Sequence, residues 1–146
     1  MKDGIIAVHN GIIVNYDDLW KSHSGISRQF EIDTEIMLSL LRVHLKNGGS
    51  LPMSLSNTVN ALFGTVAAAF LFEDLNKLAL ATNNGSLYVL TDHFGLVVFG
   101  SEEYFLTRLA KKMDLQRSSG FRVVQIKPGT GCVVDIEKFS FETFDF

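Results

Sequence analysis

The clearest pattern of hydrophobic positions in this chain predicts two helices in its first half. Between residues 33 and 46 the apolar side chains recur every three or four positions, as in an amphipathic helix. These side chains are Ile36, Met37, Leu40, Leu41 and Leu45. Asn47-Gly48-Gly49 is typical of a helix end. A second helix is predicted from about Pro52 to Phe63, because Leu51, Leu55, Val59 and Leu62 fall on one face.

Short apolar runs between turn residues predict strands in the rest of the chain. Residues 5–8 and 11–14 are predicted to be two short buried strands joined at His9-Asn10. Further strands are predicted at residues 65–72, 77–82, 87–91, 96–100, 121–127 and 132–136. We expect the last two to form a hairpin through residues 128–131, and we expect tight turns at 83–86 and 92–95.

Polar residues predict the starts of two more helices. Asn15 is expected to cap a short helix that reaches Lys21, and Ser101 is expected to cap a helix that ends at Lys111-Lys112. Acidic residues begin the second of these helices and basic residues end it, which suits the helix dipole. Grouped helices and mostly antiparallel strands together indicate the α+β class.

Composition narrows the class of protein. At 146 residues with 47% hydrophobic side chains, the sequence predicts one globular domain spanning 1–146. The net charge of −3 and the scattered basic residues argue against a nucleic-acid partner. The longest apolar stretch, residues 66–72, is too short to cross a membrane. A single cysteine, Cys132, excludes an internal disulfide and favours the cytoplasm. No metal or cofactor is expected, because His23, His44 and His93 lack the spacing of a metal site.

Two motifs carry the candidate chemistry. Residues 9–16 read His-Asn-Gly-Ile-Ile-Val-Asn-Tyr, and Asp33-Thr34-Glu35 follows at the start of the predicted helix. Together they resemble the HNGIIxNY…DTE signature of the class II glutamine amidotransferases, the N-terminal-nucleophile glutaminases, and most of all that of the glucosamine-6-phosphate synthases. The resemblance is strong at these motifs and looser beyond them, to about residue 136. It implies a four-layer αββα sandwich with glutamine as the substrate.

The resemblance also assigns roles to three residues. Asn10 and Gly11 would form the oxyanion hole, and Asp33 would hold the α-amino group of glutamine. The chemistry suits these residue types, because Asn10 offers side-chain N–H donors and Gly11 exposes a backbone N–H. Simpler interpretations remain: Asn10-Gly11 is also typical of a hairpin turn, and Asp33 of a helix N-cap. His9 is expected to be structural, because the family mechanism needs no histidine base there.

The nucleophile of the family is an N-terminal cysteine activated by its own α-amino group. The sequence shows no such segment, nor the family's HTRWAT stretch, whose arginine holds the substrate carboxylate. Cys132 lies in a predicted late strand and is expected to be a buried small hydrophobe. The sequence therefore predicts the C-terminal part of a glutaminase domain, with an incomplete αββα sandwich that is inactive alone.

Three hypotheses follow from this expectation. The cysteine-bearing part is a separate chain or was removed, so that adding it restores activity. Alternatively, the chain is a non-catalytic amidotransferase-like module for binding or regulation that acts as an oligomer. The third hypothesis is a truncated product with no independent role. In each case the uncovered sheet edges and apolar faces are expected to favour self-association or a partner.

Overall fold

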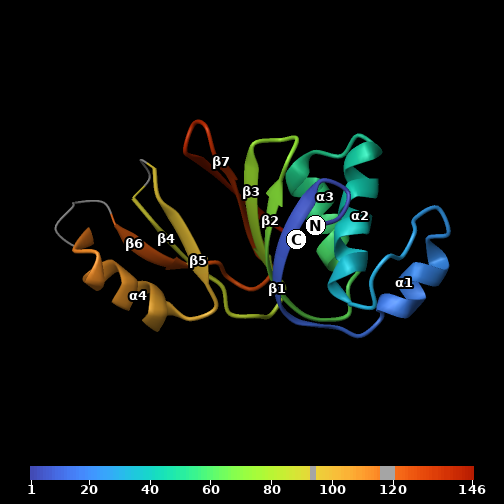
Figure 1. Ribbon diagram of the computed structural model, residues 1–146, viewed down its shortest axis with the longest axis horizontal. Helices are drawn as coiled ribbons and strands as arrows, with labels where there is room; N and C mark the ends of the chain where they lie inside the picture. The colour runs from blue at the N-terminus through green and yellow to red at the C-terminus, as the bar shows by residue number, and fades with distance from the viewer. Residues whose placement is uncertain (93–94, 116–120) are drawn as a thin grey trace.

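The structure is a computed structural model of the 146-residue chain, and it describes residues 1–92, 95–115 and 121–146. Four layers follow one another across the molecule: helices, a first sheet, a second sheet and a further helix (Figure 1). The helices are α1 (Tyr16–Ser22), α2 (Thr34–Lys46), α3 (Leu51–Asn60) and α4 (Glu103–Lys112). The strands are β1 (Ile5–Ile13), β2 (Gly64–Phe72), β3 (Lys77–Thr82), β4 (Tyr88–Thr91), β5 (Val97–Gly100), β6 (Arg122–Gln125), β7 (Thr130–Asp135) and β8 (Ser140–Asp145).

The described strands form two antiparallel sheets. The first sheet has the order β1-β2-β3-β7-β8 and the second has the order β5-β4-β6. Helices α2 and α3 cover one face of the first sheet, as Figure 1 shows. The second sheet covers the other face, and α4 packs on the outer side of the second sheet. The α+β class and the αββα order expected from the sequence are therefore confirmed.

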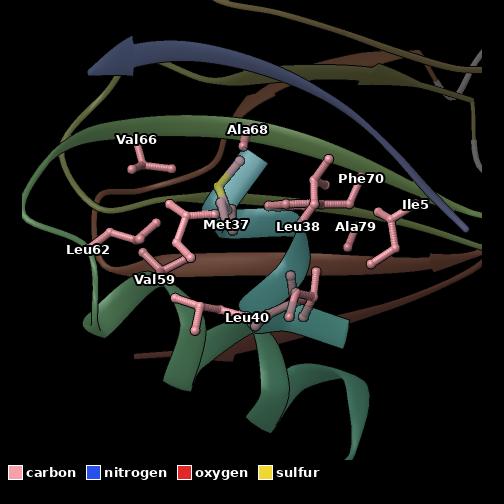
Figure 2. Packing of buried hydrophobic residues seen from close by; sticks show 14 of the residues in the cluster. Ile5, Met37, Leu38, Leu40, Val59, Leu62, Val66, Ala68, Phe70 and Ala79 are labelled. Atoms are coloured by element: carbon pink, nitrogen blue, oxygen red, sulfur yellow. The ribbon is translucent and has the colours of Figure 1, made fainter. Parts of the chain in front are cut away.

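The main core lies between the first sheet and helices α2 and α3. Side chains of α2 and α3 point at side chains of β1, β2 and β3, as Figure 2 shows. Ile36, Met37, Leu40 and Leu41 are fully buried there, so the predicted apolar stripe of α2 is confirmed. Each such side chain stabilises the fold by roughly 1.5–3 kcal/mol relative to an exposed position. This packing therefore fixes the position of β1 relative to the start of α2.

The prediction for the first strand was wrong. Residues 5–13 form one strand, and its pairing with β2 runs without interruption from Ile5 opposite Phe72 to Ile13 opposite Gly64. Asn10-Gly11 therefore lies within a strand and forms no hairpin turn. The long apolar partner strand β2 decides the outcome, because it offers hydrogen bonds along the whole length of β1, whereas a turn would forfeit them.

The predicted hairpin of the last strands was also wrong. β6 pairs with β4 in the second sheet, and β7 pairs with β3 in the first. Cys132, Val133 and Val134 are all buried, so side chains on both faces of β7 are shielded from solvent. The strand accordingly lies inside the first sheet, between β3 and β8. The sequence analysis missed β8, whose alternating side chains are only partly buried. The turn expected at 92–95 includes residues 93–94, which lie outside the described residues.

Two predicted helix caps were wrong as well. The Asn15 side chain makes no cap bond to α1. Instead, its amide donates to Ala61 O (3.0 Å) and its carbonyl accepts from Phe63 N (2.8 Å). Ser101 lies one residue too early, because Glu102 occupies the N-cap position of α4. Asn15 therefore fastens the end of β1 to the connection between α3 and β2, which is a tertiary contact that local sequence does not reveal.

A buried ion pair ties the N-terminus to α2. The Nζ atom of Lys2 lies 2.6 Å from Oε1 of Glu35, and these side chains are 4% and 1% exposed. Glu35 also accepts the amides of Gln29 and Phe30, each at 2.7 Å. Lys2 donates to Ser27 O and lies over the Trp20 ring. This network secures the segment between α1 and α2, and the sequence analysis did not anticipate it.

Gly11→Ala tests the close approach of β1 and β2. Gly11 has φ +150, and a Cβ there would overlap the carbonyl oxygen of Thr65. We expect the free energy of unfolding to fall by about 2 kcal/mol or more, because neither backbone can move without breaking the pairing. Urea unfolding measures this change. Gly25→Ala is the control, since nothing lies within 4 Å of its Cβ position, and equal losses in both variants would contradict the prediction.

Glu35→Gln tests the buried ion pair. Burial raises the pKa of Glu35, but hydrogen bonds from Lys2, Gln29 and Phe30 outweigh it and bring the pKa below its ordinary 4.5. The carboxylate therefore stabilises the fold above that pH, and this stabilisation disappears as the pH falls through the lowered pKa. We expect Glu35→Gln to lose about 3–5 kcal/mol at neutral pH, because Lys2 stays buried without a counter-charge.

Urea unfolding at neutral and acid pH measures both effects of Glu35→Gln. The variant should lose less stability than the parent chain between neutral and acid pH, because it lacks the titrating carboxylate. Glu31→Gln is the matched control, since Glu31 is exposed. An unchanged stability of Glu35→Gln at neutral pH would contradict the importance of the pair.

Candidate functional site

Asp33 is bonded to β1 rather than to its own helix. It occupies the N-cap position of α2, but its side chain makes no cap hydrogen bond. Its Oδ2 atom instead accepts the backbone N–H of Ile13 at 2.8 Å, and its Oδ1 atom lies 3.2 Å from the Thr34 hydroxyl. The simple capping interpretation of Asp33 is therefore wrong. The carboxylate is placed where the end of β1 meets the start of α2.

Gly11 shares this edge of β1 with Asp33. β1 is an edge strand of the first sheet as described, with β2 on one side only. Ile5 N donates away from β2 to Lys2 O, and Ile13 N donates away from β2 to Asp33. Alternate residues of an antiparallel strand direct their N–H groups to the same side, so the Gly11 N–H faces that edge too. Gly11 and Ile13 are two residues apart, which is about 6.8 Å along a strand.

Asn10 opens toward the space between the two sheets. It alternates with His9 and Gly11 along β1, and its exposed side chain lines a cavity of about 170 Å³. Residues of both sheets form the walls, among them Val8, Ala67, Ser86, Leu87 and Phe99. Asp33 does not line this cavity. The structure thus brings Gly11 and Asp33 together at one strand edge and directs Asn10 to the adjoining inter-sheet face.

His9 and Thr34 connect these residues. The Nδ1 atom of His9 lies 3.0 Å from the Thr34 hydroxyl, and its Nε2 atom lies 3.4 Å from Thr65 O. Sequence reasoning missed Thr34, although it stands inside the Asp33-Thr34-Glu35 motif. The motif itself was the signal, because each of its three residues makes a tertiary contact. Asp33 and Thr34 bond to β1. Glu35 bonds to Lys2 before β1 and to Phe30 before α2.

Cys132 is unsuited to act as a nucleophile. It is 4% exposed, on β7, in the apolar layer between the two sheets. Burial, with a smaller contribution from the Glu142 carboxylate, raises the pKa of the Cys132 thiol to about 11. The thiolate, which is the reactive form, is therefore scarce at neutral pH. The prediction that Cys132 is a buried small hydrophobe is confirmed.

Within residues 1–92, 95–115 and 121–146, no three His, Cys, Asp or Glu side chains gather as metal ligands would. In the same residues, none of the helices has the length and apolar character needed to span a bilayer.

An apolar surface adjoins the Asn10 cavity. Ile6, Val8 and Ile12 of β1 alternate with the residues that face α2, so they point to the side of the second sheet. They are 48%, 59% and 60% exposed, and Leu71, opposite Ile6, is 41% exposed. We call these four residues the open apolar face. The second sheet covers β2, β3 and β7 but leaves this face in contact with solvent.

Comparison with known proteins identifies relatives in sequence. Residues 1–108 match the model of the glutamine amidotransferase domain. The glutamine–fructose-6-phosphate aminotransferase (isomerizing) of Bradyrhizobium diazoefficiens is 32% identical over 109 residues, covering 73% of this chain and 18% of the relative. The enzyme of the same name from Caulobacter vibrioides is 33% identical over 100 residues, covering 67% and 16%. The chain thus spans about a fifth of the length of these curated relatives.

Solved structures share the fold. Glutamine phosphoribosylpyrophosphate amidotransferase from B. subtilis superimposes with a TM-score of 0.70 at 20% identity, covering 99% of this chain and 30% of that one. A glutamine aminotransferase class-II domain protein from Silicibacter pomeroyi gives a TM-score of 0.55 at 17% identity, covering 97% and 67%. With most of its length matched by the domain model and its four layers shared with these structures, this chain belongs to the class II glutamine amidotransferases of the N-terminal-nucleophile fold.

Proposed function

We propose that residues 1–146 supply the oxyanion donors and the ammonium-binding carboxylate of a class II glutaminase site. Glutamine is the amide donor, Asn10 and Gly11 stabilise the oxyanion, and Asp33 binds the α-ammonium group. The observation that carries this proposal is the hydrogen bond from Ile13 N to Asp33, which holds the carboxylate at the edge of β1 that also bears Gly11.

The spacing along this edge suits glutamine. The amide carbon and the α-nitrogen of glutamine are four bonds apart, or about 5 Å when extended. The Gly11 and Ile13 amides are about 6.8 Å apart, and Asp33 Oδ2 lies within 2.8 Å of the second. A carboxylate has about four lone-pair sites, so Asp33 can accept an ammonium beside the Ile13 amide. One glutamine molecule can therefore reach both groups at once.

The reaction needs a thiolate that these residues do not provide. A cysteine with a free α-amino group would attack the glutamine amide carbon, and the carbonyl oxygen would become an oxyanion beside Asn10 and Gly11. The cysteine's own α-amino group would take up the thiol proton and pass it to the amide nitrogen as the C–N bond breaks, so that ammonia leaves and water hydrolyses the thioester to glutamate. Because the thiol of Cys132 is buried, we expect residues 1–146 alone not to hydrolyse glutamine.

The open apolar face is an argument that a further segment completes this site. Ile6, Val8 and Ile12 lie beside the Asn10 cavity, and alternate amides of β1 between Ile5 and Ile13 face outward along the strand edge. A cysteine-bearing strand added there would cover apolar surface and take hydrogen bonds from β1. The proposal holds whether that segment belongs to the same polypeptide or to another chain.

The open apolar face also favours a second candidate function. A non-catalytic amidotransferase-like module that self-associates would cover the same side chains against a second copy. Such a module would be oligomeric in solution and would release no glutamate with any added segment. This outcome separates it from the glutaminase proposal.

Protein purified from its native source tests the two functions. Intact-mass analysis and a glutaminase assay should be made on the same sample. A cysteine-bearing segment, found in the native mass or as a bound chain, together with glutamate release supports the proposal. A native mass that matches these 146 residues, an oligomeric size and no turnover would favour the non-catalytic module.

Asn10→Ala and Asp33→Asn test the assigned roles in the glutaminase-active assembly. We expect Asn10→Ala to lower kcat about 10²- to 10³-fold, because one oxyanion donor is lost. Asp33→Asn should raise KM for glutamine roughly tenfold or more, because a charge-assisted hydrogen bond to the ammonium is lost. Asn84→Ala, at an exposed position, is the control. Unchanged kinetics in both site variants would refute the assignment.

Cys132 gives a further test of where the nucleophile lies. Its raised pKa leaves about a hundredfold less thiolate than an ordinary thiol with a pKa of 9.0. We therefore expect iodoacetamide to modify it at least about a hundredfold more slowly in the native chain than in urea. Cys132→Ala should leave the glutaminase activity of the assembly unchanged. Loss of activity in a folded Cys132→Ala protein would overturn this part of the proposal.

A further inference from the structure

The hydroxyl of Thr34 stands between two groups that can both accept its proton. Its Oγ1 atom is 3.0 Å from Nδ1 of His9 and 3.2 Å from Oδ1 of Asp33. A hydroxyl carries a single proton, so it donates to one neighbour at a time. The direction of this proton therefore determines whether Oδ1 of Asp33 is already occupied by a hydrogen-bond donor.

The second nitrogen of His9 helps to settle this direction. Nε2 lies 3.4 Å from the carbonyl oxygen of Thr65, which can only accept a hydrogen bond. A favourable contact there requires a hydrogen on Nε2. In the neutral ring Nδ1 then carries no hydrogen, so it can accept the proton of Thr34 in place of Oδ1 of Asp33. Oδ1 of Asp33 and Oγ1 of Thr34 are left as two adjacent acceptors.

We propose that His9 is a positioning residue that directs the Thr34 hydroxyl and thereby makes the Asp33–Thr34 pair an acceptor site for an ammonium group. The inference rests on the proposed function, since it concerns the site that binds the α-ammonium of glutamine. With neutral His9, the ammonium donates to Oδ1 of Asp33 and to Oγ1 of Thr34. His9 acts through Thr34 and Asp33 and does not touch the substrate.

Protonation of His9 reverses the arrangement. Both ring nitrogens then donate, so Nδ1 donates to Thr34 and Thr34 donates to Oδ1 of Asp33. The ammonium then competes with the hydroxyls and N–H groups that donate to Oδ1 and Oγ1, and it meets an additional positive charge nearby. Glutamine should therefore bind more tightly when His9 is neutral than when it is protonated.

The charged groups around His9 are few. At the N-terminal end of α2 they are the carboxylates of Asp33 and Glu35, and Glu35 is paired with Lys2. Strand β2 faces His9 with residues 65–69, which have no titratable side chain. Since Glu35 is already neutralised by Lys2, we expect Asp33 and His9 to be the pair that couples through Thr34.

Nuclear magnetic resonance tests the inference without any ligand. Correlation spectra of the imidazole nitrogens should show neutral His9 as the Nε2–H tautomer. The carboxyl carbon of Asp33 should shift as His9 titrates in the parent chain and in Thr34→Ser, which keeps a hydroxyl. Thr34→Val removes the hydroxyl and should abolish most of this shift. An Nδ1–H tautomer, or an equal shift in Thr34→Val, would overturn the inference.

Glutamine binding separates this inference from the proposed function. The dissociation constant for L-glutamine, measured on the assembly with its nucleophilic cysteine replaced by alanine, should rise about tenfold between pH 8 and pH 5.5, as expected when one charge-assisted hydrogen bond is lost. In Thr34→Val and in His9→Gln this dependence should shrink to about twofold, while Thr34→Ser retains it. Glutaramate, which lacks the amino group, should show no dependence.

The outcomes are distinguishable. If glutamine fails to bind at every pH, the proposed function is contradicted, and the spectra still decide the coupling of His9, Thr34 and Asp33. If glutamine binds and Asp33→Asn weakens it, but Thr34→Val keeps the full pH dependence, the proposed function stands. The positioning role of His9 is then wrong.

Discussion

The structure depends on carboxylate oxygens at the start of α2 that accept hydrogen bonds from other segments. Asp33 accepts a hydrogen bond from the outward-facing amide of Ile13. Because β1 is an edge strand, no second neighbouring strand accepts this bond. Glu35 accepts the amides of Gln29 and Phe30 and the ammonium of Lys2 in a buried position. These bonds satisfy polar groups that would otherwise be unpaired near the core, and they fix α2 against β1.

The same arrangement has a chemical consequence. The two ends of the outer edge of β1 are occupied, by Lys2 at Ile5 and by Asp33 at Ile13, while the Gly11 amide between them faces outward. Gly11 tolerates its backbone conformation and the close approach of Thr65 only because it has no side chain. The Gly11 amide of β1 and the Asp33 carboxylate from the start of α2 therefore come to lie along one strand edge. The proposed glutaminase site needs such a preorganised pair, an amide for the oxyanion and a carboxylate for the ammonium.

Hydrophobic periodicity and local residue preferences predicted the elements that are amphipathic or that form continuous apolar runs. The stripe of α2, the strands β2 and β3 and the fold class followed from periodicity. Local rules did not anticipate where a distant partner overrides a local preference. Asn10-Gly11 favours a turn, but pairing with β2 over nine residues outweighs it. Asn15 favours a cap, but the free backbone groups of Ala61 and Phe63 attract its side chain.

The motifs by themselves indicated the family and named Asn10, Gly11 and Asp33 as candidates. A signature is a fixed order of residue types, so it can be recognised without knowing the geometry. Only the tertiary structure decided what those residues touch. It placed Asp33 on the amide of Ile13 rather than on its helix, linked it to His9 through Thr34, and buried Cys132 between the sheets. Such contacts join residues 20 or more positions apart or in different layers, so no local pattern records them.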